Sequence, residues 1–163
     1  MRSTFLICLG VFFVASGAKA EFECLSRGAA LPVDNARVLE MKSGTPNQYH
    51  DRAHIEGVLQ GVFPDKTGHH HFEVAIGPAS SDVIEVIYNE DFGGIPALTA
   101  GMSVEACGDY ITANAPSGGY PASPDGAIVH WVHRSPNPHH DSGFLVLGGV
   151  MCGQDSAHSG PKH

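Results

Sequence analysis

Apolar and polar residues alternate along short runs between residues 53 and 133, and Gly- and Pro-rich segments bound each run. The clearest run is residues 71–76, where Phe72, Val74 and Ile76 alternate with polar or small side chains. A period of two is typical of a β-strand that buries one face. The pattern predicts a mainly β fold with five strands, at residues 53–62, 71–76, 83–88, 103–112 and 127–133.

The third and fourth runs are separated by a long irregular connection at residues 89–100, which contains Gly93, Gly94 and Pro96. Five short strands with one long connection fit a small five-stranded Greek-key barrel of OB type, preceded by a short helix. A small β-sandwich is the alternative. The residues predicted to form the core are Val74, Ile76, Val86, Val104, Ile128 and Val132.

The remaining segments have different compositions. Residues 21–52 predict an N-terminal arm with a short helix, because Asp34 is a typical N-cap before the partly apolar residues 35–42. The OB-like domain is predicted at residues 53–153. The polar residues 154–163 are predicted to be a disordered tail.

Residues 1–20 have the features of a signal peptide. Arg2 gives a positive start, residues 5–15 are apolar, and Ala18-Lys19-Ala20 fits a cleavage site. The apolar run is too short to cross a bilayer stably. We therefore expect a secreted or periplasmic protein whose mature chain begins at Glu21.

Removal of Arg2 and Lys19 leaves seven of the nine Lys and Arg residues against seventeen Asp and Glu, a formal charge of −10. Nonspecific nucleic-acid binding depends on cationic side chains, so this charge makes a nucleic-acid partner unexpected. The same charge opposes attachment to anionic membranes. The expected partner is a metal ion.

Two groups of histidines suggest a metal site. Neutral imidazole is the commonest ligand for Zn²⁺ and Cu²⁺, and His69 and His71 share one face of a strand. His130 and His133 are three residues apart, so they converge only if their strand ends or bulges near Trp131. The predicted Zn²⁺ or Cu²⁺ ligands are His69, His71, His130, His133 and His140.

Plainer interpretations remain open. Histidines often only bond carbonyl oxygens, and Trp131 is interpreted as a core residue, with a stacking platform for a base or sugar as the alternative. No Gly-x-Ser-x-Gly, phosphate-binding loop, His-Glu-x-x-His or Cys-x-x-Cys motif occurs, so no catalytic residue is predicted. The preferred function is a metal-holding binding module. The alternatives are a metal-dependent hydrolase, such as a phosphodiesterase or nuclease, and a structural or interaction protein.

Three motifs resemble the DUF3465 family of uncharacterised secreted bacterial proteins. They are Phe-Pro-Asp followed by Gly-His-His-His-Phe at 63–72, Gly-Met-Ser-Val with Gly-Asp-Tyr at 101–110, and His-Trp-x-His…Pro…His…Gly-Phe within 126–144. The resemblance covers residues 56–153 and implies an OB-like fold with no settled activity. The chain departs from the family in an expanded 113–125 loop, in His70 where glutamine is usual, and in Cys107 and Cys152 where aromatic residues are expected.

Three cysteines, Cys24, Cys107 and Cys152, follow the predicted cleavage site. An oxidising compartment favours one disulfide, while three buried apolar thiols are the alternative. Cys107 lies on the polar face of its predicted strand, and Cys152 follows the last apolar segment. Since the resemblance implies aromatic residues at both positions, we predict a Cys107–Cys152 disulfide, with Cys24–Cys152 as the alternative.

Overall fold

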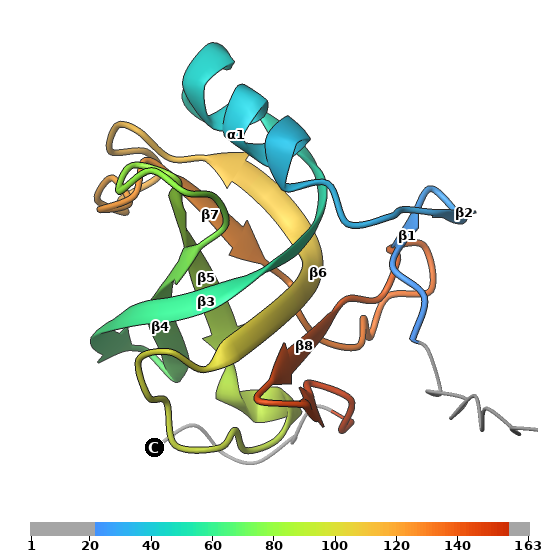
Figure 1. Cartoon of the computed structure of the whole chain (residues 1–163). Helices are drawn as coiled ribbons and strands as arrows, with labels where there is room; N and C mark the ends of the chain where they lie inside the picture. The colour runs from blue at the N-terminus through green and yellow to red at the C-terminus, as the bar shows by residue number, and fades with distance from the viewer. Residues whose placement is uncertain (1–21, 157–163) are drawn as a thin grey trace, which may run out of the picture.

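The computed structural model describes residues 22–156 and is mainly β, with one α-helix (Figure 1). The predicted signal peptide at residues 1–20 lies outside the described residues, as does most of the predicted tail at 154–163. No helix within residues 22–156 is long and apolar enough to span a membrane.

The N-terminal arm contains the predicted helix. Helix α1 spans Asn35–Gly44, and the Asp34 carboxylate accepts a hydrogen bond from the Arg37 amide at 2.9 Å, as expected of an N-cap. Val38 and Met41 of α1 are buried against the sheet. Two short strands not predicted from the sequence, β1 (Leu25–Ser26) and β2 (Ala29–Ala30), form a hairpin in the arm.

The main sheet has seven strands in the order β3-β4-β5-β7-β6-β8-β9. Because the long strand β3 pairs with β6 as well as with β4, the pairings β3-β4-β5-β7-β6 return to β3. All pairings are antiparallel except β5 with β7, which is parallel. The strands span β3 His50–Lys66, β4 His69–Ala75, β5 Val83–Asn89, β6 Ser103–Thr112, β7 Ala127–His130, β8 Phe144–Leu147 and β9 Val150–Cys152.

The prediction of five strands was wrong in number. The apolar segment after residue 143 folds as a β8–β9 hairpin, and β8 pairs with β6. Gly148 and Gly149 form its two-residue turn with φ angles of 57° and 86°, which glycine adopts without steric cost. The last predicted strand also ends three residues early, at His130.

Five of the six predicted core residues are buried, and the prediction was wrong for Ile128. In β7 the side chains of Ala127 and Val129 point into the core, so the alternation of the strand turns Ile128 outward, where it is half-buried. The five confirmed core residues are Val74, Ile76, Val86, Val104 and Val132.

Cys107 forms its disulfide with Cys24, so both predicted pairings, Cys107–Cys152 and Cys24–Cys152, were wrong. Cys152 is a buried free thiol. It aligns across the sheet with Leu145 and therefore shares the core face, whereas Cys107 aligns with Phe144 and faces the opposite side. Opposite faces of one sheet cannot be bridged by a disulfide.

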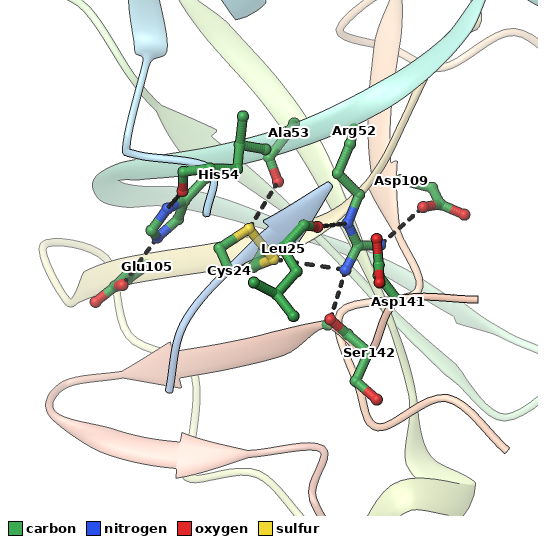
Figure 2. Close-up of a disulfide and its surroundings, with 12 residues drawn as sticks. Cys24, Leu25, Arg52, Ala53, His54, Glu105, Asp109, Asp141 and Ser142 are labelled. Atoms are coloured by element: carbon green, nitrogen blue, oxygen red, sulfur yellow. Dashed lines mark hydrogen bonds and ion pairs between the residues drawn. A yellow bond between two sulfur atoms is a disulfide. The ribbon is translucent and has the colours of Figure 1, made fainter. Parts of the chain in front are cut away.

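The buried Arg52 side chain lies beside this disulfide (Figure 2). Its guanidinium donates hydrogen bonds to the backbone carbonyls of Leu25 at 3.0 Å and Ser142 at 2.6 Å. It also forms an ion pair with Asp109 at 2.8 Å. Arg52 therefore joins the arm, strand β6 and the loop before β8.

The disulfide gives the first testable prediction. Replacing both Cys24 and Cys107 by alanine should lower the free energy of unfolding by about 2–5 kcal/mol, because the unfolded chain gains conformational freedom. Denaturant unfolding measures this loss. Peptide mapping without reductant should find the Cys24 and Cys107 peptides joined by a disulfide and the Cys152 peptide unlinked. A disulfide-linked Cys152 peptide would contradict the structure.

Candidate functional site

A pocket of about 390 Å³ lies between the turn at residues 66–69 and the loop at residues 113–126. Three of the five predicted site histidines line it, His69 and His71 from β4 and His130 from the end of β7. Ile87, Ile111 and Ile128 supply apolar lining, and the highly exposed Tyr120 lies on the 113–126 loop at its edge. The predicted face-sharing of His69 and His71 is therefore confirmed.

His69 and His130 are adjacent in this pocket, with their ring centroids 5.5 Å apart. The Nδ1 atom of His69 lies 3.0 Å from the carbonyl oxygen of Thr67. Since a carbonyl only accepts, the neutral His69 ring carries its hydrogen on Nδ1 and keeps the Nε2 lone pair for another partner. A hydrogen bond of this kind is typical of histidines that bind metals.

His71 has the same kind of partner. Its Nδ1 atom lies 2.7 Å from a carboxylate oxygen of Glu85 on β5, and both side chains are largely buried. This contact fixes the orientation of the imidazole at the wall of the pocket. Nε2 is left for a partner of its own when Nδ1 carries the hydrogen.

The environment of His130 favours its neutral form. Burial, followed by the charges that His69 and His133 would carry, lowers the pKa of His130 to about 4, while Asp109 acts in the opposite direction. At neutral pH the ring is therefore uncharged and keeps a nitrogen lone pair.

The other two predicted site residues, His133 and His140, lie beside Trp131. The His133 ring stacks on Phe92 with centroids 3.6 Å apart, and its Nδ1 atom lies 2.9 Å from the carbonyl oxygen of Arg134. Burial lowers the pKa of His133. The Nε2 atom of His140 lies 2.8 Å from Asp109, whose other oxygen is paired with Arg52.

Trp131 is half-buried, so the expectation that it is a core residue was wrong. Its φ angle is 57°, a left-handed conformation that is strained for a bulky side chain. Strand β7 ends at His130, immediately before Trp131. His133 therefore lies outside the strand, so the alternation that would place His130 and His133 on opposite faces no longer applies. The Trp131 ring centroid lies 5.2 Å from that of His133 and 4.9 Å from that of His140.

The five histidines thus fall into two groups, one in the pocket and one around Trp131. Within residues 22–156, no three His, Cys, Asp or Glu side chains are already gathered as a group that could hold a metal ion. The common ion site for His69, His71, His130, His133 and His140 stays a prediction.

Two carboxylates that orient predicted site histidines were not predicted from the sequence: Glu85, which contacts His71, and Asp109, which contacts His140. A charged residue inside an otherwise apolar run such as Val83–Tyr88 is a signal that could have identified Glu85. Asp109 gave no comparable signal, because its role depends on the pairing of β6 with β7.

A scan against models of known protein families finds no match for this chain, and a search of curated proteins finds no significant relative. The resemblance of residues 56–153 to the DUF3465 family therefore stays a prediction. The geometry of the site carries the functional argument alone.

The backbone contact at Trp131 can be tested through Gly143. A Cβ atom at this position would overlap the carbonyl oxygens of Trp131 and Cys107. Gly143→Ala should therefore lower the free energy of unfolding by about 1–3 kcal/mol and shift the fluorescence of the single tryptophan. Gly44→Ala is the control, because a Cβ there meets nothing within 4 Å; equal stability of the two variants would contradict the contact.

The pKa of His130 can be measured by NMR titration, with His130→Gln to assign its signal. The midpoint should lie at about 4. Because the unfolded chain binds this proton first, His130 should make the free energy of unfolding decrease as the pH falls from about 6.5 to about 4, and His130→Gln should weaken that decrease. A His130 midpoint near 6.5 would refute its burial.

Proposed function

We propose that this protein is a secreted or periplasmic binding module of OB type, and that it holds a transition-metal ion, Zn²⁺ or Cu²⁺, at its histidine-lined pocket. The observation that carries the proposal is the pair of imidazoles from β4 and β7, whose ring centroids lie 5.5 Å apart. Two imidazoles that share one ion have ring centroids about 5 Å apart, given metal–nitrogen distances of about 2.0–2.1 Å.

The strand pairings support the OB-type assignment. Five strands, β3, β4, β5, β7 and β6, form a circuit of pairings, as in a small closed barrel. OB barrels bind ligands on the face of their second and third strands, between the loop that joins strands one and two and the loop that joins strands four and five. The 66–69 turn and the 113–126 loop correspond to these two loops, and the pocket lies between them.

The chemical state of the two imidazoles supports a metal ligand. A metal ion needs neutral imidazole, and burial keeps His130 neutral well below neutral pH. His69 is oriented by the Thr67 carbonyl. The pair supplies two ligands, so water or a molecule in the pocket would complete the coordination.

The disulfide and the N-terminal sequence support a location outside the cytoplasm. The Cys24–Cys107 disulfide is compatible with an oxidising compartment, and the signal-like residues 1–20 agree with it. The acidic charge agrees with a cation as the partner.

Calorimetric titration with Zn²⁺ and Cu²⁺, on protein without a histidine tag, tests the proposal. Changing both His69 and His130 to alanine should weaken binding at least about tenfold, because each removes a ligand. Binding should also weaken in acid, because protons compete for imidazole nitrogen.

His139→Ala is the matched control, because His139 is exposed on the loop after β7 and lies outside the pocket. It should leave the affinity unchanged. Equal affinities for the wild type and the double variant would show that the pair holds no metal.

A further inference from the structure

The histidine-lined pocket is larger than a metal ion and its water ligands require. Its volume is about 390 Å³, whereas a water molecule, the usual further ligand of a protein-bound ion, occupies about 30 Å³. Pockets of about 300–1,000 Å³ are those in which proteins hold small organic molecules. The pocket therefore has room for an organic ligand beside an ion.

Three isoleucines from adjacent strands give the pocket an apolar wall next to the histidines. Ile87 of β5 is paired across the sheet with His71, and Ile111 of β6 is paired with Ile128 of β7. All three isoleucines are half-buried, and Ile128 points away from the core. A ligand that covers this hydrocarbon removes it from water, which is favourable.

The loop at the edge of the pocket presents an aromatic ring. Tyr120 is 77 % exposed and lines the pocket. Its backbone exchanges two hydrogen bonds with Ser117, at 3.0 and 2.9 Å, across Gly118 and Gly119. These glycines have φ angles of 59° and 86°, as in a tight two-residue turn. The turn fixes the position of Tyr120 while most of its ring stays free to stack on a ligand.

The base of the same loop is held by hydrogen bonds, so the pocket exists without a ligand. The amide of Ala113 donates to the carbonyl of Gly126 at 2.9 Å, and the amide of Ser123 donates to that of Ala113 at 2.8 Å. The amide of Ala115 donates to the side chain of Asn47 at 3.2 Å. Sites for small molecules are usually formed in advance in this way.

The charges around the pocket favour an uncharged ligand. Among the described lining residues other than histidines, only Lys66 and Glu85 carry a full charge. Lys66 is exposed, and the Glu85 carboxylate already contacts His71. The acidic charge of the chain opposes a polyanion such as a nucleic acid, so the ligand is a free small molecule.

The polar end of the pocket selects a nitrogen heterocycle. Because the Nδ1 hydrogen of His69 faces the Thr67 carbonyl, its Nε2 lone pair can accept a hydrogen bond from a ligand N–H group. When an ion occupies the histidine pair, a ring nitrogen can join its coordination. We infer that the pocket takes a small uncharged heteroaromatic molecule, which stacks on Tyr120, covers the isoleucines and turns its nitrogen toward His69 and His130.

Benzimidazole is a suitable probe, because it combines a flat apolar bicycle with an N–H group and a nitrogen lone pair. Titration into isotopically labelled, metal-free protein at mildly alkaline pH should give saturable NMR shifts at Ile111, Ile128 and the 113–126 loop. Imidazole has the same nitrogens without the second ring and should bind at least about tenfold more weakly. Absence of saturable shifts with benzimidazole, or equal affinities for the two probes, would overturn the inference.

Variants of the two apolar contacts complete the test. Tyr120→Ala should weaken benzimidazole binding at least about fivefold, because it removes the stacking ring, while Tyr120→Phe should retain the affinity. Ile128→Thr keeps the β-branched shape and should weaken binding about fourfold. Val150→Thr is the matched control, because Val150 is 52 % exposed on β9 and lies outside the pocket. Unchanged affinity in both Tyr120→Ala and Ile128→Thr would also overturn the inference.

The inference rests on the proposed function only for the ring nitrogen that joins a bound ion. Because the probe is titrated into metal-free protein, its outcome is independent of the Zn²⁺ and Cu²⁺ titrations. Benzimidazole binding in a protein that holds no metal would retain this inference and reject the metal proposal. Metal binding without benzimidazole binding would do the reverse.

Discussion

The buried guanidinium of Arg52 is the interaction on which the arrangement of this structure depends most. Three segments that are distant in sequence meet at it: the arm at Leu25, strand β6 at Asp109, and the loop before β8 at Ser142 (Figure 2). The second carboxylate oxygen of Asp109 lies within hydrogen-bond distance of His140 Nε2. Without Asp109 the positive charge of Arg52 would be buried and unpaired, which is costly. The ion pair therefore fixes the register of β3 on β6 and the position of the loop that carries His140.

Close backbone packing adds to this constraint. At Gly108 of β6 a Cβ atom would overlap the carbonyl oxygen of His130, and at Gly143 it would overlap that of Trp131. The end of strand β7 is thus tightly packed at two successive residues, and the chain leaves the strand through Trp131, which has a left-handed conformation. Strain of this kind persists only where the surroundings determine it, and here it aims His130 at the pocket while His133 stacks on Phe92.

Local patterns predicted much of the fold. Alternation located the strands and five core residues, and Asp34 located the helix. The errors arose where tertiary contacts decide the outcome. Val129 and Ile128 have equal β propensity, so only packing reveals which is buried. The Cys24–Cys107 disulfide depends on where the N-terminal arm packs against the sheet, which the spacing of the cysteines along the chain does not reveal. For the site, the face shared by His69 and His71 followed from strand geometry, but the partition of the histidines into two groups depends on the end of β7.

Burial also sets how the groups around the pocket respond to protons. The proposed metal binding needs a neutral His130, which the pKa of about 4 provides at any higher pH. Asp125, at the end of the 113–126 loop, is shifted in the opposite direction: burial, followed by the charge of Glu73, raises its pKa to about 7. Burial is the largest cause of both shifts, since desolvation disfavours the charged form and so lowers the pKa of an imidazole and raises that of a carboxyl group.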